Sequence, residues 1–96
     1  MKNEFCIMPE NPLYSTERIN GYHRHEVFFG SSNRQLSIKY GLIVFLPPEL
    51  HNMSNKGVHF DHNFDLQLKQ IGQATAMKYY GWSKEEFIKV FGRNFI

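Results

Sequence analysis

The chain contains one cysteine, Cys6, among its 96 residues. A single thiol cannot form an internal disulfide, and it cannot build a cysteine-rich zinc site, so both kinds of scaffold are excluded. Long apolar runs are also missing: none approaches the roughly 20 residues that span a bilayer, and the first residues lack a signal-peptide pattern. We therefore expect a soluble cytoplasmic protein with no membrane partner.

The sequence has little excess charge of either sign. The sequence has eleven Lys and Arg and nine Asp and Glu, which gives a formal net charge of +2. This excess is too small to indicate a nucleic-acid partner, but it is compatible with a local basic face. The hydrophobic content of 42 % and the length of 96 residues fit one folded domain with a modest core.

Histidine, in contrast, is concentrated in one stretch. All five histidines lie between residues 23 and 62: His23, His25, His51, His59 and His62. Amides and carboxylates are interleaved with them. Imidazole is the commonest metal ligand in proteins and the only side chain whose unperturbed pKa lies near neutrality. The stretch is therefore a candidate metal and acid/base site.

Hydrophobic patterning predicts an α+β fold. The first 21 residues, with Pro9 and Pro12, are expected to form an N-terminal arm, and residues 22 to 96 to form one domain. Short β-branched and aromatic runs predict strands at 25 to 29 and 42 to 46, joined by a polar segment with a helical turn at 35 to 40. Pro48 to Met53 can begin a short helix that carries His51 and ends near Gly57.

Two further helices are expected at the C-terminal end. Phe64, Leu68 and Ile71 recur at helical spacing, with Asp61 as a candidate N-cap and Gly81 as a stop. Ser83 followed by Glu86 three residues later predicts a capping box for the last helix. The aromatic residues Tyr79, Tyr80 and Trp82 have two interpretations, a homodimer interface or part of the core.

The expected elements bring the polar side chains together. His23 and His25 lie two residues apart on a strand and so share one of its faces, while Arg24 and Glu26 take the other. His51 and Asn55 are four residues apart and share a helix face if the helix extends that far. A strand histidine facing a helix-borne histidine and amide can hold one divalent ion beside a second imidazole.

These residues resemble a known family. The motifs are HEVFFG at residues 25 to 30, Asn33-Arg34, GLIV at 41 to 44, His51-Asn52 and GVHF at 57 to 60. Together they resemble the HNH endonuclease superfamily with its ββα-metal core, and more narrowly the small phage and prophage proteins of the recombination-enhancing nuclease type. The resemblance covers residues 22 to 95. It implies a two-stranded ribbon and a helix around a metal, with C-terminal helices as a buttress.

The resemblance implies metal-dependent hydrolysis of DNA phosphodiester bonds. In this chain, His25 matches the general base, Asn33 the residue that orients it, and His51 a ligand of Mg²⁺ or Mn²⁺, with Zn²⁺ as an alternative. The remaining candidate ligands are His59, Asn55 and His23. Candidate DNA contacts are Arg24, Arg34, Lys39 and Lys56, to which Lys69, Lys78 and Arg93 could add, although a scattered, solvated charge is the simpler account of any one basic residue. If phage-encoded, the protein would act in the host cytoplasm.

The chain departs from the family pattern at two places. Residues 46 to 52 read LPPELHN where relatives tend to read Leu-Cys-x-x-His-His-Asn, and Arg24 stands where the wider superfamily often has Asp or His. An arginine cannot bind a cation but can hold a phosphate through two hydrogen bonds. These departures leave an alternative open, a catalytically degenerate scaffold that binds DNA or inhibits a host defence protein. A purely structural zinc ion is a third interpretation.

Overall fold

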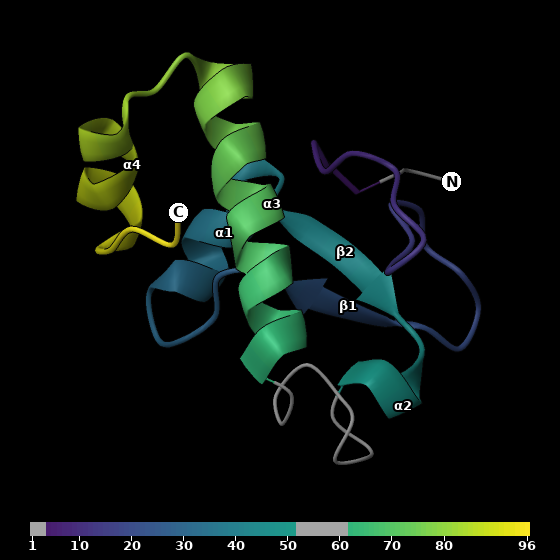
Figure 1. Cartoon of the computed structure of the whole chain (residues 1–96). Coiled ribbons are helices and arrows are strands. Elements are labelled where there is room, and N and C mark those ends of the chain that lie inside the picture. The colour runs from purple at the N-terminus through teal and green to yellow at the C-terminus, as the bar shows by residue number, and fades with distance from the viewer. Residues whose placement is uncertain (1–3, 52–61) are drawn as a thin grey trace.

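The computed structural model describes residues 4–51 and 62–96. Its elements are, in order, β1 (His23–Glu26), α1 (Asn33–Tyr40), β2 (Ile43–Leu46), α2 (Pro48–His51), α3 (His62–Tyr80) and α4 (Lys84–Phe91) (Figure 1). The expected α+β class, with a two-stranded ribbon and C-terminal helices, is confirmed. Within the described ranges, no helix has both the length and the apolar character needed to cross a membrane.

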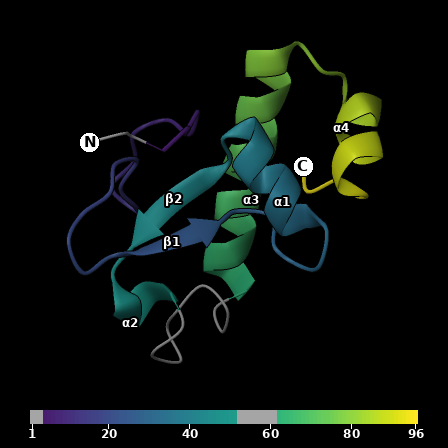
Figure 2. The same cartoon turned by 180° about the vertical axis from the view of Figure 1, so that it is seen from behind.

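The two strands form an antiparallel ribbon in which His25 is paired with Val44 and Glu26 with Ile43. All four residues of β2 are buried, as its unbroken apolar run predicts. Views from the front and from behind place α3 across one face of the ribbon (Figures 1 and 2). The same views place α1 beside α4.

The first strand was predicted at residues 25 to 29, but β1 begins at His23 and ends at Glu26. The cause is a side chain from α1. The buried hydroxyl of Ser37 accepts a hydrogen bond from the Phe28 N–H (3.0 Å) and donates one to the Phe28 carbonyl (2.8 Å). Because Ser37 occupies both backbone groups of Phe28, the strand ladder cannot continue through this residue.

The N-terminal segment, expected as an arm, lies along β2. Ser15 and Phe45 exchange two backbone hydrogen bonds of 3.0 and 2.8 Å, and the Ile7 N–H donates to the Gly41 carbonyl (2.8 Å). Met8 and Tyr14 are buried in the core. Parts of the segment therefore pack as part of the domain, and Ser15 pairs with the edge of β2 that the ribbon alone would leave open.

The expected helices are present. The helical turn predicted at 35 to 40 is the C-terminal part of α1. Helix α3 ends at Tyr80, and the next residue, Gly81, has the left-handed φ of 69° that favours glycine. The predicted capping box is confirmed: the Glu86 N–H donates to the Ser83 hydroxyl (3.1 Å), and the Ser83 N–H donates to the Glu86 carboxylate (2.7 Å). The candidate N-cap Asp61 lies outside the described residues.

An aromatic cluster around Phe28 forms the centre of the core. Its ring centroid lies 5.4 Å from that of Phe87, 4.6 Å from that of Phe91 and 5.3 Å from that of Phe95. Gly72 lets α3 come close to this cluster, because a Cβ at that position would stand 3.0 Å from Val27. The segment that leaves β1 is thus held between α3 and α4.

Candidate functional site around His25

His25 lies in the middle of β1 and is almost fully buried, with 1 % of its surface exposed. Its ring centroid lies 5.6 Å from that of Phe29, with the two planes tilted by 58°. His23 is half-buried and Arg24 is exposed, as the alternation of side chains along a strand predicts. Arg24 and Glu26 share the opposite face, where they form an ion pair of 3.0 Å.

Helix α2 follows β2 after one residue and contacts both strands of the ribbon. It begins at Pro48, whose fixed φ suits a first helical position and whose lack of an N–H costs nothing there. His51 is the last residue of α2. The order of strand, strand and helix therefore brings the strand that carries His25 against the helix that carries His51 (Figures 1 and 2).

Several expected site residues cannot be placed in this arrangement. The candidate ligands Asn55 and His59 and the candidate DNA contact Lys56 lie outside the described residues. Among residues 4–51 and 62–96, no group of three His, Cys, Asp or Glu side chains is arranged to hold a metal ion.

Asn33, expected to orient the base, has a different partner. It is the first residue of α1, and its side-chain amide donates a hydrogen bond to the Phe91 carbonyl (3.1 Å) at the end of α4. This contact joins two helices that lie 58 residues apart in the sequence. The role that the structure gives Asn33 is to hold α1 against α4.

Two of the candidate DNA contacts are held by carboxylates. Arg24 pairs with Glu4 (2.8 Å) as well as with Glu26, and Arg34 lies 3.6 Å from Glu26. Arg18 also pairs with Glu4. The hydrogen bond from Arg24 lowers the pKa of Glu4 and that bond in turn raises the pKa of Arg24, so this pair is charged throughout the neutral range. A phosphate group would have to compete with these carboxylates.

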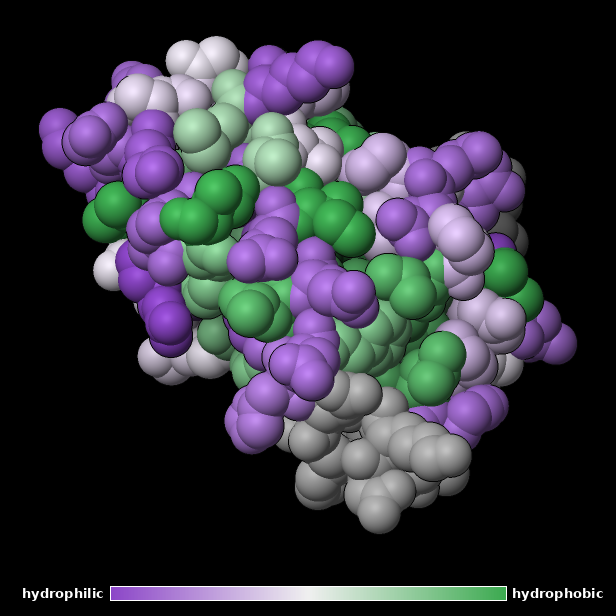
Figure 3. All heavy atoms as spheres, in the orientation of Figure 1, coloured by the Kyte–Doolittle hydropathy of each residue, from purple (hydrophilic) through white to green (hydrophobic). Residues whose placement is uncertain are grey.

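Lys39 stands apart from that network, with its ammonium 5.3 Å from the ring centroid of Tyr40. The aromatic residues near the end of α3 serve mainly as packing. The Tyr80 hydroxyl donates to the Tyr40 carbonyl (2.8 Å), and its ring stacks on Trp82 at 5.0 Å. Only Tyr79 of this group is largely exposed, at 60 %. Figure 3 shows hydrophilic residues over much of the displayed face, with a group of adjoining hydrophobic residues below and to the right of its centre.

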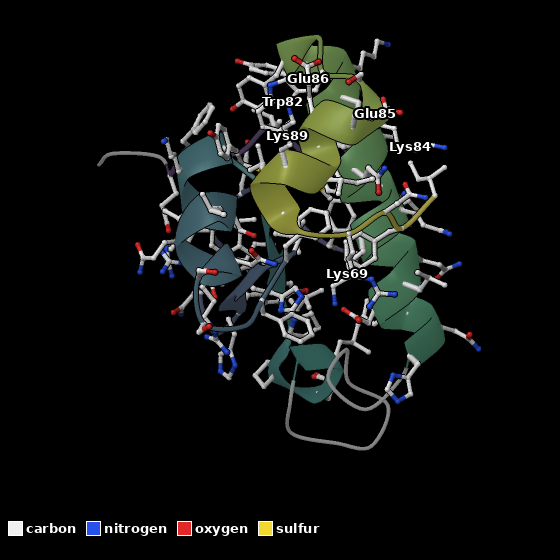
Figure 4. All side chains as sticks on the ribbon, turned by 90° about the vertical axis from the view of Figure 1, so that its left-hand side faces the viewer. Lys69, Trp82, Lys84, Glu85, Glu86 and Lys89 are labelled. Carbon is white, nitrogen blue, oxygen red and sulfur yellow. The ribbon has the colours of Figure 1, made fainter. Side chains whose placement is uncertain are left out.

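Sequence reasoning missed an ion pair next to this site. The Lys69 ammonium lies 2.6 Å from the Asp65 carboxylate and 3.9 Å from the ring centroid of Phe29. Figure 4 shows Lys69 reaching from α3 toward the interior, whereas Lys84 points outward. The only signal in the sequence was the i, i+4 spacing of Asp65 and Lys69, which is common on exposed helix faces.

Comparison with known proteins finds no relative of this chain. No protein-family model, curated protein or solved structure matches the chain.

Proposed function

We propose that this chain is a phage-type HNH-like endonuclease that hydrolyses DNA phosphodiester bonds, with His25 as the general base. The observation that supports the proposal is the placement of His25 in a two-stranded ribbon against which the His51-bearing helix packs. A histidine imidazole can act as a general base by taking a proton from water.

In the proposed reaction, His25 removes a proton from a water molecule, and the water oxygen attacks the phosphorus. The bond from phosphorus to the leaving oxygen then breaks, and that oxygen takes a proton from solvent water, which gives a phosphate monoester and a free hydroxyl. His25 afterwards releases its proton to solvent. Because His25 is only 1 % exposed, water and the phosphodiester reach its imidazole only if neighbouring residues move aside. The proposal therefore requires a local opening around β1 before cleavage.

A divalent ion, Mg²⁺ or Mn²⁺ with Zn²⁺ as an alternative, would neutralise charge on the phosphate when bound. The candidate ligands are His51, His59, Asn55 and His23. His23 stands two residues before His25 in β1, and His51 ends α2, so these two come from elements that touch.

The direct test is incubation of supercoiled plasmid with the protein and Mg²⁺ or Mn²⁺. We expect nicked product with the natural chain and none with His25→Ala. His62→Ala is the matched control, because His62 is an exposed histidine at the start of α3 and should leave cleavage unchanged. Absence of nicking with every metal, or equal nicking by His25→Ala, would remove the catalytic proposal.

A second candidate function is a scaffold of the same kind that has lost its chemistry and binds DNA or a host defence protein. The observations that favour it are the burial of His25 and the engagement of Arg24 and Arg34 by carboxylates. Metal analysis of the purified protein separates the two candidates. Stoichiometric metal that disappears in His51→Ala favours the nuclease. A chelator that unfolds the protein would instead indicate a structural zinc ion.

A further inference from the structure

The ion pair of Asp65 and Lys69 is unusual because it is largely withdrawn from solvent. The two side chains are 17 % and 12 % exposed. Lysine and aspartate rarely lose so much hydration, and one hydrogen bond does not generally offset the cost of desolvating both charges. Within the described ranges, the buried Oδ1 of Asp65 has no hydrogen-bond partner, so the pair is not fully satisfied either. Stability alone is therefore a poor explanation for its position.

The surroundings of the Lys69 ammonium suggest another explanation. It lies 3.9 Å from the ring centroid of Phe29, a distance that gives a favourable cation–π interaction. The Phe95 ring lies farther away, at 5.9 Å. Asp65, one helical turn earlier on α3, fixes the ammonium by its 2.6 Å contact. Lys69 thus reaches across from α3 and holds the ring that follows β1.

The same ring also contacts the proposed base. Phe29 stands four residues after His25, and their ring centroids are 5.6 Å apart. A shift of the Phe29 ring would change the space open to the imidazole, because the two rings are in contact. Asp65, Lys69, Phe29 and His25 therefore form a continuous series of contacts from α3 to the middle of β1.

We propose that Lys69 is a positioning residue for His25, acting through the Phe29 ring, with Asp65 holding its ammonium in place. The inference rests on the proposed function for its catalytic consequence, but the coupling of Lys69 to the His25 ring can be measured without it. Lys69 does not itself touch the reacting atoms in this proposal.

The first measurement is the NMR spectrum of the 96-residue chain with isotope-labelled histidine. In Lys69→Met, which keeps the length of the side chain and removes its charge, we expect the His25 ring resonances to move and those of His62 to stay in place. Lys69→Arg restores a cation over Phe29 and should return the His25 resonances toward their natural positions. Lys78→Met is the matched control, because Lys78 is an exposed lysine on the same helix.

Two further variants separate an effect on the position of the His25 ring from a general effect of the substitution on folding. Asp65→Asn retains Lys69 but removes the charge that holds it, so it should move the His25 resonances even if Lys69→Met folds poorly. In Phe29→Leu the connecting ring is absent, so adding Lys69→Met should move the His25 resonances no further. Unchanged His25 resonances in both Lys69→Met and Asp65→Asn would overturn the inference.

The catalytic consequence is tested by steady-state cleavage of plasmid DNA. We expect Lys69→Met to lower kcat about tenfold at unchanged KM, which corresponds to about 1.4 kcal/mol of lost transition-state stabilisation. Lys69→Arg should recover most of kcat. A rise in KM alone would instead make Lys69 a DNA contact and overturn the positioning role. If the natural protein cleaves no DNA, the proposed function fails, and the NMR result still decides whether Lys69 positions the His25 ring.

Discussion

Replacing Ser37 with alanine tests how the segment after β1 is held. Ser37 is fully buried, and its hydroxyl satisfies both the N–H and the carbonyl of Phe28, which is itself 1 % exposed. Alanine has no hydroxyl, so the N–H and the carbonyl of Phe28 both stay buried without this hydrogen-bond partner. Each buried group left unsatisfied costs about 1–3 kcal/mol.

The expected net loss follows from these terms. Two unsatisfied groups cost roughly 2–4 kcal/mol after partial relaxation, and the better helix propensity of alanine in α1 returns about 0.5 kcal/mol. We therefore expect the free energy of unfolding to fall by about 1.5–3.5 kcal/mol, a large part of the 5–15 kcal/mol typical of a domain. The melting temperature should fall by roughly 6–28 °C in a domain of this size.

Urea denaturation followed by circular dichroism measures this loss, with the m-value expected to stay unchanged. Ser32→Ala is the matched control, because Ser32 is exposed at the N-terminus of α1 and its hydroxyl makes no capping hydrogen bond there. It should change stability by less than about 0.5 kcal/mol. A loss below about 1 kcal/mol in Ser37→Ala would refute the reasoning that these two hydrogen bonds end the strand and hold Phe28.

Three other predictions concern stability. Gly72→Ala should destabilise the protein by about 1 kcal/mol in urea denaturation, because overpacking against Val27 at 3.0 Å outweighs the gain in helix propensity; a stabilised variant would contradict this. Ser83→Ala should cost about 1 kcal/mol in thermal melts, since it removes the acceptor for the Glu86 N–H, and an unchanged melt would argue against the capping box. Burial raises the pKa of Tyr14 from its ordinary 10.0 to about 12, so the stability that the neutral phenol contributes is fully present below pH 10 and is lost as pH rises toward 12. Tyr14→Phe should lessen this fall in the free energy of unfolding. Equal pH dependence in both proteins would exclude Tyr14 as its source.

Local patterns predicted the helices well. The spacing of Phe64 and Leu68 and the capping box at Ser83 depend on neighbours three or four residues away, so the sequence displays them directly. The apolar run at 42 to 46 likewise predicted β2 almost to the residue. In each case the interaction that stabilises the element lies within the element or at its end.

Contacts between distant residues could not be predicted in this way. The end of β1 depends on Ser37, nine residues after Phe28, and the amide of Asn33 finds its partner 58 residues away. The N-terminal segment was predicted to be an arm because its prolines favour extended or turn conformations. This local preference carries no information about the distant partner, the edge of β2 with which Ser15 pairs. The spacing of these residues in the sequence does not indicate which distant residues they contact.

The candidate site shows the same difference between features set by local patterns and features set by distant contacts. Alternation along a strand predicted that His25 and His23 share a face, and a proline start predicted the helix that carries His51. The burial of Lys69 could not be predicted, because an i, i+4 pair of opposite charges usually lies on an exposed face. Only the packing of α3 against the segment after β1 turns this pair toward the protein interior.

The three residues that follow β1 connect the core to the candidate site. Phe28 packs into the aromatic cluster with Phe87 and Phe91, while its neighbour Phe29 contacts both His25 and Lys69. Ser37 holds the backbone between these two rings. A change at Ser37 should therefore act on the His25 ring as well as on stability, although its hydroxyl bonds only to Phe28. In a Ser37→Ala protein kept folded at low temperature, shifted His25 resonances would show that the core and the site move together.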